Sequence, residues 1–600
     1  MQATSRYAVP AHLNADAYKS GHKAQYPLNS EFMLFNFTAR SDKYFNTPLA
    51  KDGIISFGIR RFVEDYLRDH WNTSFFNRPK PEVLAEIDEI MNGVLGAETI
   101  PMSHWAALHD LGYLPVGVDA VPEGTLVPMK VPMMTFFPTH PDHAWVAGYL
   151  EDAFSNENWK VAAIATIAFH YKRICLQWAE KTCDNTDHIP WQCHDFALRG
   201  MSGMNDGALN NIGHLTSFKG TDSFPAVYTT KRVYGKNVPV CEIGNSVPAT
   251  EHSVMTANIM LNIRQIFAEL ADDMDAEQRY EAERATFEHM ITAVYPTGIV
   301  SLVADSFNFF RTIGGITVDL KDKILARQGK LVFRPDSGNP YHIVCGYKVI
   351  HFSDAKEIIL ERMERNPEYH GTLNVQGVKD TTEADADKLN YLDKYIRREA
   401  GAELLIWNVD DSGAMTMNLD TKEVRWMSTV EIKGALATLW GIFGGTINNK
   451  GYRLIDEHVG LIYGDSITME LAQRIFSRME EMGFASSNIV YGVGSFTYQY
   501  ITRDTFGDAV KSTYLEVRDQ NPFMLCKEPV TDMGLKKSAK GCVYAIQTEE
   551  GIKMVDGLTK EQYMEDVENG YTLFNRVFFN GECKNGEGIQ TIRDRVASYL

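Results

Sequence analysis

Residues suited to bind a phosphorylated ligand occur in three short segments of the chain. Arg334 and Asp336 lie in the segment RPDSGNP (334–340). An arginine can bind a phosphate, carboxylate or carbonyl group at two points, and an aspartate can accept hydrogen bonds from sugar hydroxyls. Gly464-Asp465-Ser466 and Gly494-Ser495 each follow an apolar run, where backbone N–H groups can bind an anion. These residue types indicate a ligand that carries phosphate and hydroxyl groups.

Other residues could bind an aromatic ring or react with a ligand. Phe196 stands between His194 and Arg199, so an exposed ring could stack on a heteroaromatic ligand, although a core Phe beside an ion pair is commoner. His252 follows turn residues and precedes a helical pattern. A histidine at the start of a helix can act as acid, base or nucleophile, whereas an isolated histidine is more often structural. The residues alone leave these alternatives open.

The elements that must position these residues form a series of strands, turns and helices. Four apolar runs are followed within two residues by Asp, Arg or Gly. They are 299–303, 331–333, 459–463 and 489–493. Helical periodicity occurs at 81–95, 255–272, 276–293, 353–365, 382–399 and 468–483, and strands are predicted within 114–137. Such series are typical of an α/β barrel or a doubly wound sheet, in which ligands bind at the carboxyl ends of strands. The four strand ends therefore predict one shared site, although Asp and Gly are also common turn residues.

Residues 341–430 depart from this series. They include two polar helical patterns and two apolar runs separated by 410–413, which could pair as a hairpin. We interpret the stretch as an insertion, which could be an inert surface elaboration, a lid or an extra dimer contact.

Charge and composition limit the possible functions. The chain has 600 residues, with 59 Lys and Arg against 78 Asp and Glu, a net charge of −19. This charge argues against nonspecific binding to nucleic acid or anionic membranes, so a phosphate ligand requires a local basic cluster. The 8 cysteines form no CxxC pair, the N-terminus lacks a signal-peptide pattern and no apolar run could span a membrane, so we expect a cytoplasmic protein. Neither a Walker or dinucleotide fingerprint nor a metal-ligand motif occurs, so we do not expect a metal site built by the protein alone.

Nine short segments in one order carry a resemblance to a known family. They are DAYKSGHKAQYP (16–27), AVPEG (120–124), HDFALRG (194–200), FKGTD (218–222), SVPATEHS (246–253), VADS (303–306), RPDSGNP (334–340), YGDS (463–466) and TRD (502–504). The set closely resembles the nicotinamide phosphoribosyltransferases, which belong to the type II phosphoribosyltransferase family. The resemblance implies an irregular α/β barrel with an α+β domain built from N- and C-terminal segments. It implies domains at 1–155, at 156–510 for the barrel with its insertion, and at 511–600 for a segment that packs back on the first domain.

The resemblance also implies an activity. Such enzymes transfer the phosphoribosyl group of 5-phosphoribosyl-1-pyrophosphate to nicotinamide, giving nicotinamide mononucleotide and pyrophosphate in NAD salvage. They use Mg²⁺ carried by the substrate phosphates, hydrolyse ATP through a phosphohistidine and form head-to-tail homodimers with active sites at the interface. Neither nucleic acid nor a membrane is implied as a partner.

Residue roles follow from the resemblance by motif. Phe196 and Tyr18 of the partner subunit would stack on the pyridine ring, while Asp222 and Arg334 would hold its edge. His252 would be the phosphorylated residue, oriented by Asp305. Glu251 and Asp336 complete the predicted catalytic residues. The ribose and 5′-phosphate would be bound by Asp16, Asp336, Gly464, Asp465, Gly494 and Ser495, with the partner subunit's Arg503 and the partner subunit's Lys511. The pyrophosphate or ATP would be bound by Arg40, Arg199, His252, Lys527 and Lys536.

Asp222 decides between two substrates of the same class. A carboxylate at this position would repel nicotinate and accept a hydrogen bond from an amide, which favours nicotinamide. Nicotinate phosphoribosyltransferase is therefore the nearest alternative. A catalytically silent interaction protein should have lost site residues such as His252 and Arg503, and an unrelated α/β-barrel lyase would not explain the nine segments. The family usually has consecutive glycines where this chain has Gly494-Ser495, which bears on the geometry of the phosphate loop.

Overall fold

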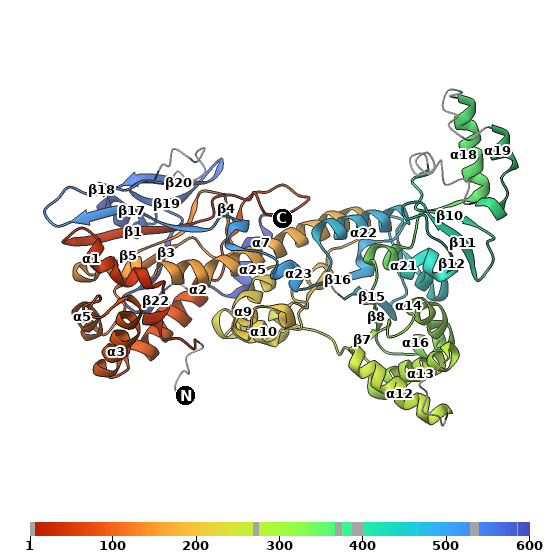
Figure 1. Ribbon diagram of the computed structural model, residues 1–600, viewed down its shortest axis with the longest axis horizontal. Helices are drawn as coiled ribbons and strands as arrows, with labels where there is room; N and C mark the ends of the chain where they lie inside the picture. The colour runs from red at the N-terminus through yellow and green to blue at the C-terminus, as the bar shows by residue number, and fades with distance from the viewer. Residues whose placement is uncertain are drawn as a thin grey trace. The chain divides into compact units, whose positions relative to one another are not determined.

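The computed structural model describes residues 7–267, 275–365, 375–386, 400–464, 466–527, 539–584 and 586–600. These residues belong to two compact units (Figure 1). Unit 1 comprises Met1–Ile174, Ile189–Ser246 and Val493–Leu600, and unit 2 comprises Cys175–His188 and Val247–Gly492. The domain boundaries implied by the resemblance stay a prediction.

Unit 1 is built on a sheet that joins the two ends of the chain. Its seven strands lie in the order β18-β17-β1-β5-β3-β21-β22 and pair antiparallel. Their bounds are β1 (Ser30–Thr38), β3 (Val116–Ala120), β5 (Pro132–Pro138), β17 (Ala509–Val517), β18 (Phe523–Met524), β21 (Asn575–Phe579) and β22 (Glu582–Cys583). In the register of β1 and β17, Asn36 lies opposite Lys511. The expected α+β region from N- and C-terminal segments is therefore present.

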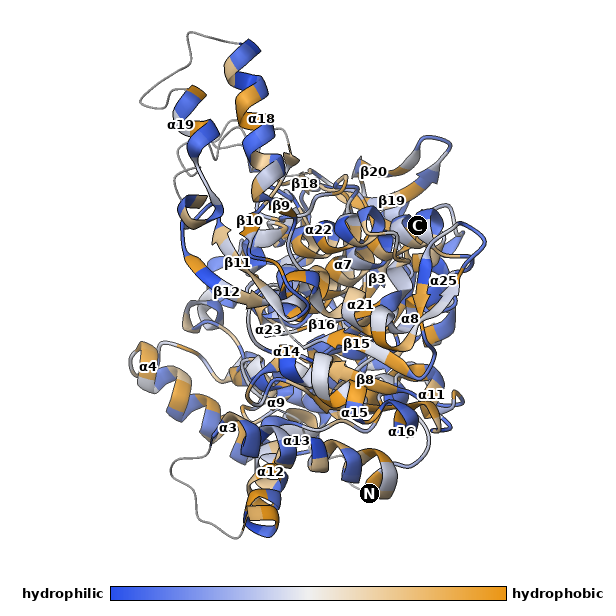
Figure 2. Ribbon diagram, turned by 90° about the vertical axis from the view of Figure 1, so that its right-hand side faces the viewer, coloured by the Kyte–Doolittle hydropathy of each residue, from blue (hydrophilic) through white to orange (hydrophobic). Residues whose placement is uncertain are grey.

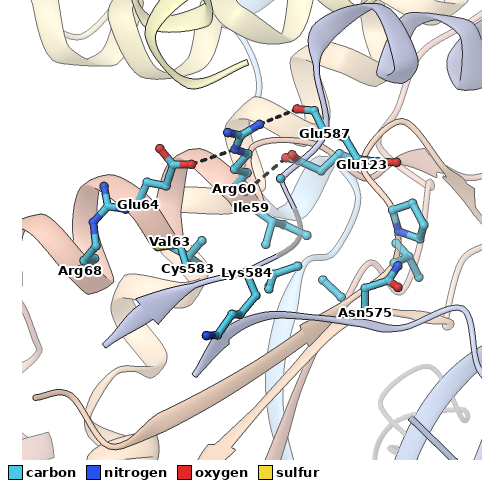
Figure 3. A pocket seen from close by; sticks show the side chains of 15 residues that line it. Ile59, Arg60, Val63, Glu64, Arg68, Glu123, Asn575, Cys583, Lys584 and Glu587 are labelled. Carbon is cyan, nitrogen blue, oxygen red and sulfur yellow. Dashed lines mark hydrogen bonds and ion pairs between the residues drawn. The ribbon is translucent and has the colours of Figure 1, made fainter. Parts of the chain in front are cut away.

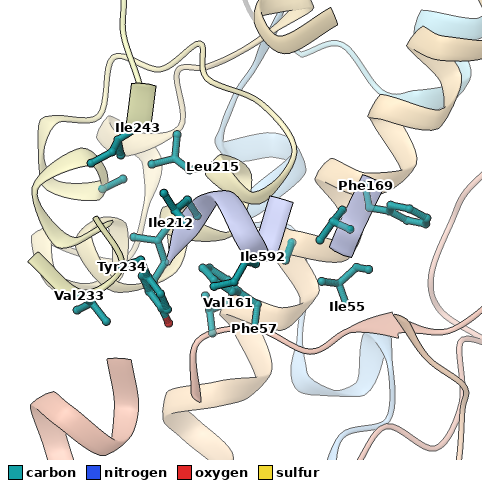
Figure 4. Close-up of a cluster of buried hydrophobic side chains, with 14 residues drawn as sticks. Ile55, Phe57, Val161, Phe169, Ile212, Leu215, Val233, Tyr234, Ile243 and Ile592 are labelled. Atoms are coloured by element: carbon teal, nitrogen blue, oxygen red, sulfur yellow. The ribbon is translucent and has the colours of Figure 1, made fainter. Parts of the chain in front are cut away.

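The C-terminal helix adds a second link between distant segments of unit 1. Helix α25 (Ile589–Ala597) contributes Ile592 to a buried apolar cluster with Val161 of α7 (Glu151–Thr182) and Phe57. Figure 4 shows Ile592 lying among Val161, Phe57 and Ile212. Burial of this many aliphatic and aromatic side chains stabilises unit 1, since each contributes roughly 1.5–3 kcal/mol on the transfer scale.

Unit 2 contains the predicted parallel strands. They are β7 (Val300–Val303), β8 (Leu331–Arg334), β15 (Val459–Tyr463) and β16 (Ile489–Val493), in the order β16-β15-β8-β7. Nearly all their residues are buried, as expected for a parallel sheet with helices on its faces. Helices α12 (His252–Phe267), α13 (Ala276–His289), α21 (Thr429–Phe443) and α22 (Met469–Glu481) accompany them. The four strand predictions and the α/β class are confirmed.

The insertion forms a small sheet of its own in unit 2. Strands β9 (Val349–His351), β10 (Leu404–Trp407), β11 (Gly413–Asn418) and β12 (Val424–Ser428) lie in the order β12-β11-β10-β9. The hairpin is confirmed, because β10 and β11 pair antiparallel and Asp410 Oδ1 accepts hydrogen bonds from the N–H groups of Ser412 and Gly413. Helices α18 (Phe352–Arg365) and α19 (Val375–Asp380) lie side by side, and Figure 2 shows apolar and polar residues alternating along α18. Most of the helix predicted at 382–399 falls outside the described residues.

Candidate functional site

The carboxyl ends of β7 and β8 meet at Asp305 in unit 2. Oδ1 of Asp305 lies 3.0 Å from Nε2 of His252, the first residue of α12. Its Oδ2 accepts hydrogen bonds from the Asp336 N–H at 2.9 Å and the Ser337 hydroxyl at 2.7 Å. Burial opposes ionisation of Asp305, but these hydrogen bonds and His252 outweigh it and hold the pKa below its usual value. An ionised carboxylate therefore orients an imidazole whose side chain is 47% exposed.

Arg334 and Gly464 lie at the ends of neighbouring strands in the same unit. The Arg334 side chain donates a hydrogen bond through Nη2 to the Thr250 carbonyl, at 2.9 Å. A Cβ on Gly464 would lie 2.2 Å from Oδ1 of Asp336, so a side chain there would displace the Asp336 carboxylate. Unit 2 thus brings together His252, Asp305, Asp336 and Gly464 as predicted, and Glu251 directly precedes His252. Asp465 lies outside the described residues.

In unit 1, Asp222 lies beside two residues of the HDFALRG segment. Nε2 of His194 is 2.9 Å from Oδ1 of Asp222, which also accepts a hydrogen bond from the Ser246 hydroxyl. The ring of Phe196 lies 4.6 Å from the ring of His194, centroid to centroid, with the planes tilted by 39°. An acceptor carboxylate and an aromatic ring therefore occur together, as a site for a pyridine amide requires.

Asp195 supports this arrangement and was missed by the sequence analysis. It is 1% exposed and accepts hydrogen bonds from the Ala197 N–H at 2.9 Å and the Asn211 side chain at 3.2 Å. Burial raises its pKa to about 6, against the effect of these hydrogen bonds. The buried carboxyl fixes the turn that carries Phe196. In the sequence, this role could have been suspected only from the position of Asp195 between the aromatic side chains of His194 and Phe196.

Ser495, in the loop expected to bind the 5′-phosphate, fits against Gly200 of the HDFALRG segment. A Cβ on Gly200 would lie 2.1 Å from the Ser495 hydroxyl oxygen. Ser495 begins helix α23 (Ser495–Tyr498) and is not among the described residues with positive φ. The departure from consecutive glycines is therefore accommodated by the missing side chain of Gly200, without backbone strain.

Four cations from distant segments gather in unit 1. We define Arg40, Arg503, Lys511 and Lys527 as the basic cluster. Burial lowers the pKa of Lys511, and repulsion from Arg40, Lys527 and Arg503 lowers it further, partly opposed by Glu151. Within the described ranges, neither Arg40 nor Lys511 has a carboxylate within ion-pair distance. Such unneutralised cations form a binding site for a polyanion.

Arg40 is held in place by the loop that follows Arg503. Its backbone N–H donates to the Phe506 carbonyl at 3.0 Å, and its Nε donates to the Gly507 carbonyl at 2.8 Å. Gly507 has φ +61°, a left-handed conformation that favours glycine. The guanidinium is thereby fixed through one nitrogen.

Three further predicted residues of unit 1, Asp16, Tyr18 and Arg199, also lie outside the basic cluster. Tyr18 is 59% exposed. The backbone N–H of Asp16, two residues before it, donates to Asp152 Oδ2 at 2.8 Å. Arg199 is exposed in the short turn Leu198–Gly200. Lys536 lies outside the described residues.

A pocket of about 480 Å³ in unit 1 contains none of the predicted residues. Figure 3 shows its lining, in which Arg60 donates hydrogen bonds to Glu64 at 2.8 Å and to the Glu587 carbonyl at 2.6 Å. Its two arginines, Arg60 and Arg68, are thus already paired with Glu64 and Asp69, so the basic cluster is the better anion site.

Three further features concern metal ligands, membrane-crossing helices and disulfides. Within the described part of the chain, no three His, Cys, Asp or Glu side chains are grouped as metal ligands. No helix of that part has the length and apolar character needed to cross a membrane. All eight cysteines are described, and none of them forms a disulfide.

Known proteins with similar sequences share one activity in their names. Residues 191–397 and 406–578 match the family model described as the nicotinate phosphoribosyltransferase (NAPRTase) family. A protein of Acinetobacter baylyi named nicotinamide phosphoribosyltransferase is 37% identical, over 98% of this chain and 97% of its own length. Proteins of the same name from Mycoplasma pneumoniae and Xanthomonas campestris pv. campestris are each 26% identical, over 87% and 88% of this chain and 92% and 86% of their own. These matches confirm the resemblance carried by the nine segments: the chain belongs to the nicotinate phosphoribosyltransferase (NAPRTase) family.

Proposed function

We propose that the protein is a nicotinamide phosphoribosyltransferase, which forms nicotinamide mononucleotide and pyrophosphate from nicotinamide and 5-phosphoribosyl-1-pyrophosphate. The observation that carries the choice of base is the position of Asp222, which is held by His194 and Ser246, while the ring of His194 lies against the ring of Phe196. The names of the full-length relatives support the same reaction.

Phe196 would stack on the pyridine ring, and Asp222 and Arg334 would bind its edge. The Asp222 carboxylate can accept a hydrogen bond from the carboxamide N–H of nicotinamide, whereas it would repel the carboxylate of nicotinate. The contact with His194 fixes the orientation of the carboxylate. This preference for the amide argues against the nicotinate alternative.

The phosphate groups would be bound by the basic cluster of unit 1, together with Lys536 and Arg199. Gly494-Ser495 would bind the 5′-phosphate with the partner subunit's Arg503 and the partner subunit's Lys511. Asp16, Asp336 and Gly464-Asp465 would bind the ribose. Arg40 and Lys527 would bind the pyrophosphate. Because the leaving group gains negative charge as the glycosidic bond breaks, fixed cations stabilise the transition state.

Mg²⁺ fits this site as an ion brought by the phosphates. The strand-end carboxylates are few, and Asp305 already contacts His252, Ser337 and the Asp336 N–H, so they suit a metal shared with the substrate. When bound, the ion neutralises charge on the pyrophosphate. The residues themselves position an uncharged base next to the anomeric carbon, and positioning of this kind is worth up to roughly 7–11 kcal/mol.

His252 would couple the reaction to ATP. If Nε2–H donates to Asp305, the Nδ1 lone pair can attack the terminal phosphorus of ATP and release ADP; water later hydrolyses the phosphohistidine to phosphate. Asp305, ionised at neutral pH, stabilises the imidazole in this orientation. Glu251 stands next to it in the chain.

The enzyme would act as a homodimer in the cytoplasm. Tyr18 is 59% exposed, so Tyr18 of the partner subunit could cover the second face of the pyridine ring. Eight described cysteines without a disulfide suit a reducing compartment.

The test is incubation of the purified protein with nicotinamide, 5-phosphoribosyl-1-pyrophosphate and Mg²⁺, with and without ATP. We expect nicotinamide mononucleotide and pyrophosphate, formed faster when ATP is present. Parallel reactions with nicotinate test the alternative. Absence of product from nicotinamide under every condition contradicts the proposal.

A further inference from the structure

A buried carboxyl group lies next to the basic cluster. Asp508 is 1% exposed and precedes β17, and its backbone N–H donates to the Arg503 carbonyl at 3.1 Å. Among the described residues, no donor forms a hydrogen bond to either of its carboxylate oxygens. A buried polar group without a partner is rare in folded proteins and requires an explanation.

The charged groups that act on Asp508 belong to two segments. Arg503 and Asp504 lie in the turn before it, and Arg40 lies at the end of β1. Burial is the largest effect and raises the pKa of the Asp508 carboxyl to about 8; the two arginines oppose this and Asp504 adds to it. At neutral pH the carboxyl is therefore mainly uncharged and does not offset the charge of Arg40 or Arg503, of which Arg503 already lies 3.9 Å from Asp504, Nη2 to Oδ1.

The same two arginines belong to the basic cluster. The loop that holds Arg40 through Gly507 leads directly into Asp508, so the carboxyl and the guanidinium have fixed positions. A negative charge on Asp508 would lie close to the cations that bind phosphate. Two anions that depend on the same cations oppose each other, and a proton on one favours binding of the other.

We propose that the protonation state of Asp508 sets the affinity of the basic cluster for phosphate groups. With Asp508 protonated, Arg40 and Arg503 keep their full charge for the ligand; with Asp508 ionised, that charge is partly offset. Binding of phosphate in turn promotes proton uptake by Asp508, because linkage is reciprocal. The application to 5-phosphoribosyl-1-pyrophosphate rests on the proposed function, whereas the effect on an inorganic anion rests on unit 1 alone.

Sulfate binding to the intact protein, measured by titration calorimetry, tests this role. Sulfate stays a dianion from about pH 6 to about pH 10, so a change in affinity reports on the protein. We expect the wild-type dissociation constant to rise about tenfold as the pH passes about 8. D508N, which imitates the neutral carboxyl, should lose most of this rise, and the remainder belongs to Lys511. E550Q alters an exposed carboxylate that pairs with Lys553 elsewhere in unit 1 and should keep the wild-type profile.

Proton uptake gives a measurement that needs no variant. Titrations near pH 8 in two buffers with different ionisation enthalpies should reveal net proton uptake by the wild type on sulfate binding, reduced in D508N. If D508N does not fold, the proposal is tested with D508S and with the proton uptake of the wild-type protein on sulfate binding. No uptake by the wild type, or a D508N profile equal to that of the wild type, overturns the proposal. Failure of the proposed function would appear differently, as absence of nicotinamide mononucleotide with the sulfate profile intact.

Discussion

The Ser495 hydroxyl occupies the space that a side chain on Gly200 would need: a Cβ there would lie 2.1 Å from Ser495 Oγ and 2.4 Å from Ser495 Cβ. The two residues belong to the segment that carries Phe196 and to the phosphate loop. Their side chains are therefore mutually exclusive, and the serine is tolerated because residue 200 is glycine.

Gly200→Ala should lower the free energy of unfolding by about 1–3 kcal/mol, because the new methyl group overlaps Ser495. S495G in the same chain should restore most of this loss. Urea unfolding of both single variants and the double variant measures the coupling, with G93A as control because no atom lies within 4 Å of a Cβ there. Additive effects of the two substitutions would contradict the proposed overlap.

Asp222→Asn should shift substrate preference towards nicotinate. Removing the negative charge removes its repulsion of a carboxylate, so the ratio of kcat/KM for nicotinamide over nicotinate should fall about tenfold or more. Steady-state kinetics with both bases measures the ratio. E242Q, which alters an exposed carboxylate paired with Lys219 in the same unit, should leave the ratio unchanged. An unchanged ratio in D222N would remove Asp222 from the specificity site.

Arg40→Lys should raise KM for 5-phosphoribosyl-1-pyrophosphate, although the charge is kept. A lysine cannot both donate to the Gly507 carbonyl from an Nε position and present a guanidinium to phosphate. We expect a rise of about 10-fold or more, corresponding to at least about 1.4 kcal/mol. The matched variant K43A removes an exposed cation near the same strand and should behave as wild type. Equal KM values for R40K and wild type would refute this role.

His252→Ala should lower the ATP-stimulated rate more than the basal rate. Asp305→Asn should weaken the stimulation as well, because a neutral amide orients and stabilises the imidazole less well. Because the pKa of Asp305 lies below its usual value, its contribution should persist through neutral pH and be lost only in acid. Rates with and without ATP at several pH values measure this, and full stimulation of H252A would exclude the phosphohistidine.

Asp195 should make the free energy of unfolding fall as the pH rises, whereas the contribution of Asp305 is lost as the pH falls. Its pKa rises from 3.8 in the unfolded chain to about 6 in the folded protein, so between these values the native state holds a proton that the unfolded state releases. The contribution of this group to the free energy of unfolding is fully present below about pH 4. It falls by about 2–3 kcal/mol in total as the pH rises through about 6. Denaturant unfolding of wild type and D195N at both ends of this range measures the difference, with D504N as control. The same pH dependence in D195N and wild type would contradict the assignment.

The sequence predicted the elements that have strong local patterns. The four parallel strands, a helix near Met255 and the hairpin around Asp410 follow from apolar runs and turn residues, and the structure starts that helix earlier, at His252. Asp195 and Asp508 were not predicted as important, because the burial that raises their pKa values comes from segments distant in the chain. The fit of Ser495 against Gly200 was equally inaccessible, since it depends on the approach of two loops.

The negative net charge of the chain does not prevent four cations from gathering in the basic cluster. Arg40, Arg503, Lys511 and Lys527 come from distant segments, and the resemblance, not spacing, assigned them to phosphates. Their mutual repulsion at Lys511 is a property of the folded unit that composition cannot reveal. The roles of Asp465 and Lys536 stay predictions.

The antiparallel pairing of β1 with β17 also bears on how the protein is made. The Asn36 side chain donates to the Lys511 carbonyl, 475 residues later in the chain. At roughly 5–20 residues per second, a ribosome needs about 25–95 s to make that intervening stretch. During this time β1 has an unpaired edge, a form prone to aggregation until its late-made neighbour emerges. A chain terminated before residue 509 would contain Arg40 but neither Lys511 nor Lys527, so phosphate binding depends on nearly complete translation.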